Sequence, residues 1–230
     1  MKRTSGTYKS LTYCIPTARM LSVNLAVKMT DLNLISESVL SCKKCTLGYE
    51  RTNAVPGNGN PSSTILFIGE APGRYEDEQG LPFVGRAGRL LDSLLESINL
   101  NRSEVFITNM LKCRPPKNRD PLPDELKACG PYLNKQIEII NPKIIVTLGR
   151  FSFAWFFPEI PIGEARGNPI NLENGTTIFP MYHPAAALRN GKIRGRTEQD
   201  FLKLQKILND PIKKASGDSK NPEETQIRMF

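Results

Sequence analysis

Residues 64–73 read TILFIGEAPG, where a short apolar run at 64–68 ends at Gly69 and passes directly into a polar loop. An apolar run of this length, bounded by a turn residue, predicts a buried β-strand. Similar runs follow at 105–108, 143–148 and, more weakly, 177–180, and helical patterns lie at 86–98, 124–140, 151–156 and 197–208. Strands that alternate with helices predict an α/β fold, a three-layer αβα arrangement around a central four-stranded parallel sheet.

The composition excludes one class of protein and favours one kind of partner. The chain has 230 residues, enough for one substantial domain or two small ones. No apolar run approaches the ~20 residues of a membrane helix, so a membrane-spanning protein is excluded. A net charge of +8, from 31 Lys and Arg against 23 Asp and Glu, favours an anionic partner, nucleic acid first. Residues 31–209 carry only +3 of this charge, so DNA binding must rest on a local patch.

The two ends of the chain differ from its middle. Residues 1–30 hold five basic residues and no acid, which resembles a transit peptide, although a disordered arm or a true start at Met29 explains it better. A short helix is expected from Thr30 or Asp31 to Leu40. We therefore divide the chain into a disordered extension (1–30), a folded domain (31–209) and a polar tail (210–230). The last five residues, QIRMF, faintly resemble a sliding-clamp peptide but lack its paired aromatics.

The five cysteines point to a bound metal. Cys42 and Cys45 form a C-x-x-C pair, and Cys113 and Cys129 follow later in the chain. Four thiolates in two pairs can enclose a tetrahedral zinc or a four-iron cluster, and the spacing does not separate the two. Alternatively, Cys113 and Cys129 are merely buried apolar residues. Cys14 receives no role, and the odd count favours a reducing cytoplasm over a secreted disulfide scaffold.

Three loops carry the unusual residues of this chain. In a parallel sheet the functional site lies at the carboxyl ends of the strands, here the loops that start at Gly69, Asn109 and Met181. They contain GEAPG (69–73) with PFVGRAG (82–88), then TN (108–109) with KCRPP (112–116), and HPAA (183–186). No phosphate-binding G-x-x-x-x-G-K-[ST] loop is present.

These motifs, in this order and with the four cysteines, closely resemble the family 4 uracil-DNA glycosylases, the iron–sulfur branch of the uracil-DNA glycosylase superfamily. The resemblance runs from about Leu40 to Leu208. It implies a [4Fe-4S] cluster on Cys42, Cys45, Cys113 and Cys129. It also implies a monomeric prokaryotic cytoplasmic enzyme that hydrolyses the N-glycosidic bond of uracil in DNA, leaving an abasic site for base-excision repair.

The resemblance also implies roles in recognising the flipped base. Phe83 matches the aromatic on which uracil stacks, and Asn109 matches the amide that reads its edge. Glu76 resembles the residue that crowds uracil C5 and so keeps thymine out. Ala71 and Gly73 match further substrate contacts. Taken alone, Phe83 would be a core residue, Asn109 a turn residue and Glu76 a solvated acid.

The resemblance assigns catalysis to two residues. His183, the single histidine, is placed to donate to uracil O2, where negative charge grows in the transition state. Glu70 is the carboxylate that positions or activates water at the sugar C1′. Better-known uracil glycosylases place an Asp where this chain has Ala71, so the role of Glu70 departs from the commonest pattern. Leu188 and Arg189 match the loop that fills the gap left in the DNA, and a basic run follows them.

Two rival functions remain. A broader deaminated-base glycosylase would also release hypoxanthine or xanthine, and a non-catalytic iron–sulfur protein would bind DNA or transfer electrons without cleaving a bond. The presence of Glu70, Phe83, Asn109 and His183 together favours catalysis. A related branch that bonds covalently to DNA has a Gln in the first motif and a histidine-containing insertion near the second. Here position 70 is Glu, and only five residues separate Thr108 from Arg114.

Overall fold

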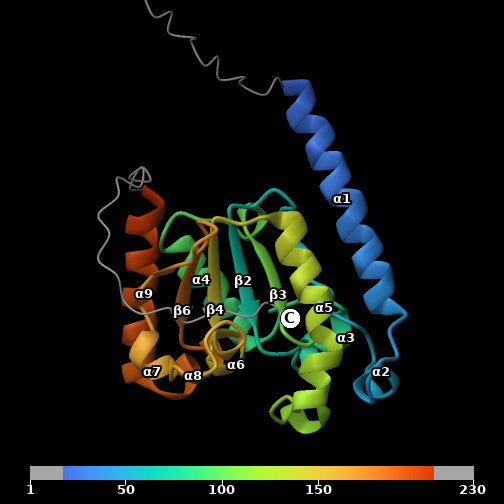
Figure 1. Ribbon diagram of the computed structural model, residues 1–230. Helices are drawn as coiled ribbons and strands as arrows, with labels where there is room; N and C mark the ends of the chain where they lie inside the picture. The colour runs from blue at the N-terminus through green and yellow to red at the C-terminus, as the bar shows by residue number, and fades with distance from the viewer. Residues whose placement is uncertain (1–17, 210–230) are drawn as a thin grey trace, which may run out of the picture.

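The computed structural model describes residues 18–209, which form an α/β domain around one six-stranded sheet (Figure 1). The strand order is β1-β3-β2-β4-β6-β5. The four central strands run parallel: β3 (Phe106–Asn109), β2 (Ile65–Gly69), β4 (Ile144–Leu148) and β6 (Thr177–Met181). These are the four strands that the apolar runs predict.

The prediction of a purely four-stranded sheet is wrong at the edges. β1 (Asn58–Gly59) and β5 (Ile170–Asn171) add a short antiparallel strand to each side. Neither strand has an apolar run, so no sequence pattern predicts them. At Gly59, φ is +134° and an added Cβ would lie 2.1 Å from the carbonyl oxygen of Val105, so β1 pairs closely only because this residue is glycine.

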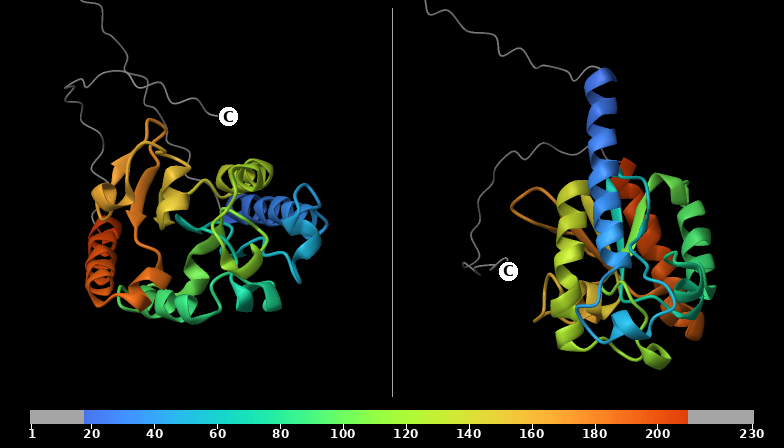
Figure 2. Two further views of the ribbon diagram at one scale, coloured as in Figure 1. Left: turned by 90° about the horizontal axis from the view of Figure 1, so that it is seen from below. Right: turned by 90° about the vertical axis from the view of Figure 1, so that its right-hand side faces the viewer.

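Alternate residues of the central strands point to opposite sides of the sheet. Leu66 and Ile68 of β2 pack towards α1 (Ala18–Leu40) and α5 (Pro123–Ile140), in one buried cluster. Ile65 and Phe67 pack towards α4 (Arg86–Glu96) and α9 (Gly191–Asn209), in a second. Figure 2 shows these two helix pairs on opposite faces of the sheet, which confirms the three-layer arrangement.

Short helical elements lie in the connections between these strands and helices. They are α2 (Leu47–Glu50), α3 (Arg74–Gln79), α6 (Arg150–Ala154), α7 (Ile162–Ala165), α8 (Pro184–Arg189) and the 3-10 turns η1 (Arg102–Glu104) and η2 (Pro116–Asn118). α9 begins earlier than the expected residue 197. Asn190 Oδ1 accepts the backbone N–H of Lys192 at 2.9 Å, so the helix starts there and the basic run becomes its first turns.

The first described helix is longer than expected. α1 begins at Ala18 rather than at Thr30 or Asp31, so residues 18–30 are helical where an irregular arm was predicted. Residues 18–40 contain no Gly or Pro, and Lys28 Nζ donates to the carbonyl oxygen of Ile140 at 3.0 Å, which ties this part of α1 to the end of α5.

Cys14 and the clamp-like residues 226–230 lie outside the described residues. No helix within residues 18–209 is long and apolar enough to cross a membrane.

Candidate active site and cysteine cluster

Three side chains meet at the carboxyl edge of the sheet. β2 ends at Gly69, β3 ends at Asn109, and His183 follows the end of β6. A Cβ added at Gly69 would lie 2.3 Å from Asn109 Oδ1 and 2.6 Å from Phe83 Cζ, so both side chains cross closely over the end of β2. The Phe83 and His183 rings are stacked with centroids 5.6 Å apart. The structure therefore brings together Phe83, Asn109 and His183, which come from the end of one strand and from two separate loops.

Asn109 presents an unused hydrogen-bond acceptor. The residue is 1% exposed, and within the described chain its buried Oδ1 has no hydrogen-bond partner. Most buried side-chain oxygens in folded proteins are paired. An unpaired one beside a stacking aromatic is an available contact for a ligand that carries a donor.

His183 is held as a neutral donor. Its Nδ1 accepts the backbone N–H of Ala185 at 3.1 Å, at the start of α8. Burial, together with the nearby cation Arg189, lowers the pKa of His183 to about 4. At neutral pH the ring therefore carries one proton, and because Nδ1 accepts a bond, that proton is on Nε2.

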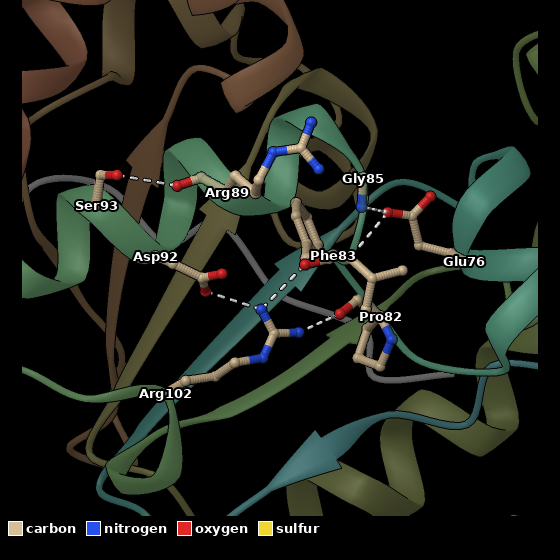
Figure 3. A network of polar contacts seen from close by, with 9 residues as sticks. Glu76, Pro82, Phe83, Gly85, Arg89, Asp92, Ser93 and Arg102 are labelled. Atoms are coloured by element: carbon tan, nitrogen blue, oxygen red, sulfur yellow. Dashed lines mark hydrogen bonds and ion pairs between the residues drawn. The ribbon is translucent and has the colours of Figure 1, made fainter.

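The carboxylate of Glu76 is fixed by backbone amides. Oε1 accepts the N–H groups of Val84 at 2.9 Å and Gly85 at 2.8 Å (Figure 3), and Oε2 accepts that of Gly73 at 3.1 Å. This side chain thereby joins the loop after β2 to the start of α4. The sequence reading as a solvated acid is wrong, because both oxygens are used.

The remaining site residues lie on the segments that follow β2 and β6. Glu70 directly follows β2, and burial and the nearby Asp120 raise the pKa of its carboxyl, while Arg150 opposes the shift. Ala71 is half-buried against the core, and Gly73 precedes the first turn of α3. Leu188 and Arg189 are exposed on α8, five and six positions after His183.

The four cysteines line a single cavity between α1, α2, the loop after β3 and α5. Arg51 Nη1 donates to Cys113 Sγ at 2.9 Å, and the backbone N–H of Lys112 donates to Cys129 Sγ at 3.3 Å. Within residues 18–209, no three His, Cys, Asp or Glu side chains are arranged to hold a single metal ion. Four cysteines around one cavity, with N–H donors to two of their sulfurs, fit a metal centre bound through thiolates.

Burial affects the free thiols of this set. It raises the pKa of Cys113, and it raises that of Cys129 to about 11, while the adjacent cations Arg51 and Lys112 oppose these shifts. The free thiols of Cys113 and Cys129 are therefore protonated at neutral pH, and a bound metal would have to displace these protons.

Lys112 links the cysteine loop to the end of β3. Its buried Nζ donates to Thr108 Oγ1 at 2.6 Å, to the carbonyl oxygen of Asn109 at 2.7 Å and to Gln136 Oε1 at 2.7 Å. All three ammonium donors are thus used, and burial lowers the pKa of Lys112 to about 8. Sequence reasoning missed Lys112, although a lysine placed between Asn109 and Cys113 in an otherwise apolar segment was the available signal.

Comparison with known proteins defines the class. Residues 56–209 match the family model of the uracil DNA glycosylase superfamily. The chain is 50% identical over 192 residues to the Type-4 uracil-DNA glycosylase of Sulfurisphaera tokodaii, covering 80% of this chain and 87% of that protein.

Two further relatives bear the same name. The Type-4 uracil-DNA glycosylase of Saccharolobus solfataricus is 51% identical over 189 residues, which cover 78% of this chain and 88% of that protein. The Type-4 uracil-DNA glycosylase of Thermotoga maritima is 44% identical over 188 residues, which cover 81% of this chain and 93% of that protein. The chain belongs to the uracil DNA glycosylase superfamily, in its family 4 branch, and the resemblance indicated by the motifs is confirmed.

Proposed function

We propose that this protein is a monofunctional uracil-DNA glycosylase that hydrolyses the N-glycosidic bond of uracil in DNA and leaves an abasic site for base-excision repair. The observation that carries the proposal is the meeting of Phe83, Asn109 and a neutral His183 at one edge of the sheet. The Type-4 names of its relatives support the substrate.

Base recognition begins when uracil leaves the DNA stack, which costs a few kcal/mol. The Phe83 ring offers a stacking surface. Asn109 Oδ1, unpaired in the described chain, accepts from the N3–H of uracil while the amide nitrogen donates to O4. Glu76, held by three amides, is fixed enough to exclude the C5 methyl group of thymine. Ala71 and Gly73 complete the wall of the site.

Bond cleavage places negative charge on uracil and oxocarbenium character on the sugar. The Nε2–H of neutral His183 donates to uracil O2, and this bond strengthens as charge develops there. Glu70 as a carboxylate orients water towards C1′ and stabilises the cationic sugar. Because the pKa of Glu70 is raised, this role weakens at acidic pH.

The four cysteines would hold the [4Fe-4S] cluster that the family resemblance implies. When bound, the cluster supplies a rigid link between the segment before the sheet, the loop after β3 and α5. Lys112 extends that link to the site, because its side chain donates to the carbonyl oxygen of Asn109. Arg51 and the Lys112 amide donate to two of the cysteine sulfurs.

DNA contacts come from α8 and the start of α9. Leu188 is 37% exposed, a suitable position for a wedge in the gap left by the flipped base. Arg189 and the exposed basic residues that open α9 neutralise phosphates, so affinity falls as salt rises. We expect the protein to act as a monomer in a prokaryotic cytoplasm. The sliding-clamp contact through residues 226–230 stays a prediction.

The test is excision from oligonucleotides that contain one uracil, detected by alkaline cleavage at the abasic site. Separate oligonucleotides with hypoxanthine or xanthine in place of uracil measure the breadth of the reaction, and an oligonucleotide with thymine at the same position is the negative control. Release of hypoxanthine as fast as uracil would favour the broader glycosylase. DNA binding without release of any base would favour the non-catalytic protein.

A further inference from the structure

Phe83 has an unusual backbone conformation. Its φ is +53°, in the left-handed region that residues with a Cβ rarely occupy. The residue is 5% exposed and lies in the loop between α3 and α4. The approach to α4 is also tight, since a Cβ added at Gly88 would lie 1.8 Å from the carbonyl oxygen of Phe83. A bulky residue stays in this conformation only where surrounding groups hold it there.

Arg102 is one of the residues that fix the Phe83 backbone. Its Nη1 donates to the carbonyl oxygen of Phe83 at 3.0 Å and to Asp92 Oδ1 at 2.9 Å, and its Nη2 donates to the carbonyl oxygen of Pro82 (Figure 3). Arg102 begins η1, just before β3, whereas Asp92 lies on α4. The Arg102 guanidinium therefore connects η1 to α4 and to the loop between α3 and α4. It binds the carbonyl oxygens of Pro82 and Phe83, on either side of the Phe83 Cα.

Glu76 holds the other side of the same loop. Its carboxylate accepts the amides of Val84 and Gly85, the two residues after Phe83. A cation thus binds the carbonyls and an anion binds the amides, each matching the polarity of the peptide groups it meets. The Phe83 backbone is consequently fixed from both sides.

We propose that Arg102, oriented by Asp92, is a positioning residue for base excision: it holds the left-handed backbone of Phe83 so that the ring forms the stacking surface for uracil. This inference rests on the proposed function and on the role proposed there for Phe83. The planar guanidinium is needed because it meets two carbonyls and a carboxylate at once. A lysine ammonium at this position would keep the positive charge but lose the two nitrogens, Nη1 and Nη2, that bind separate carbonyl oxygens.

The experiment is a double-mutant cycle in the full chain. Single-turnover uracil excision is measured for the wild type, Arg102→Met, Phe83→Ala and the double variant, and inhibition by free uracil is measured for each. We expect Arg102→Met to lower the rate about 10- to 100-fold, because a small displacement of a positioning group has effects of this size. In the Phe83→Ala background the same change should cost less than about threefold, since the two residues then act as one unit.

Two further variants separate positioning from general damage. Arg102→Lys should recover only part of the rate, and it carries the test if Arg102→Met does not fold. Lys143→Met removes an equal charge from an exposed residue just before the amino end of β4, and should leave the rate unchanged. Weaker inhibition by free uracil in Arg102→Met is a readout that lost stability alone would not give.

The outcomes that overturn the inference are distinct from failure of the proposed function. Rate losses of Arg102→Met and Phe83→Ala that multiply in the double variant would show that Arg102 acts independently of the ring. Full activity of Phe83→Ala would remove the stacking surface from the proposal, and the Arg102 role with it, while the glycosylase assignment stands. A wild type that releases no uracil would overturn both.

Discussion

Replacement of Asn109 by Asp tests the centre of the site. The two side chains have nearly the same shape, but Asn donates and accepts hydrogen bonds whereas ionised Asp only accepts them. Uracil presents O4 as an acceptor and N3–H as a donor, and cytosine presents the reverse. An ionised Asp only accepts, so it opposes uracil O4 with a second acceptor. Asn109 is 1% exposed, so little water reaches the side chain to offset the mismatch.

The expected size of the effect follows from this burial. A buried group left unpaired costs about 1–3 kcal/mol, and near-complete burial favours the upper end. Three kcal/mol corresponds to roughly a 100-fold loss of rate. We therefore expect Asn109→Asp to lose most uracil excision and to gain weak excision of cytosine, which is the poorer leaving group.

The assay is single-turnover abasic-site formation in single-stranded oligonucleotides with uracil or cytosine, which removes the cost of breaking base pairs. Asn141→Asp is the matched control, since it makes the same change at an exposed residue that ends α5, away from the site. Near-native uracil excision by both Asn109→Asp and Asn109→Ala would refute the reasoning, because the amide would then not read the base.

Three other predictions follow from the same geometry. His183→Ala should lower the single-turnover rate about 100- to 1,000-fold while DNA affinity changes little; equal losses in both would point to a structural histidine. Cys113→Ala should lose the brown colour of protein purified without oxygen and lower the melting temperature, and zinc without iron in the wild type would contradict the cluster. Because the pKa of His183 falls from 6.5 to about 4 on folding, the unfolded chain binds the proton first as pH drops. Stability should therefore decline from about pH 6.5 towards pH 4, with a shallower decline in His183→Gln; identical urea midpoints across this range would show that the histidine is not held neutral.

Local patterns were sufficient for the central sheet and for the motif loops. The four apolar runs became β2, β3, β4 and β6 because parallel strands buried on both faces are apolar throughout. The residues that follow them, Asn109 and His183 among them, then meet at the carboxyl edge as the topology requires. The family, too, was recognisable from short motifs alone.

Element boundaries were less predictable. β1 and β5 have two residues each, and they are strands only because neighbouring chain offers a partner. α1 extends back to Ala18, where a basic, acid-free segment gave no sign of a cap. Such ends depend on contacts with distant parts of the chain, as between Lys28 and Ile140.

The sequence by itself determined the fold class, the family and the residue types at the site, because each is carried by a short run of neighbouring residues. Only the tertiary structure decided how those residues are held. The bond from Ala185 that sets the proton of His183 and the grip of Arg102 on Phe83 are not written in any local pattern. The same holds for the path from the cysteines through Lys112 to Asn109. Hydrogen bonds of this kind act over about 3 Å, so they exist only once the folded chain has brought the partners into contact.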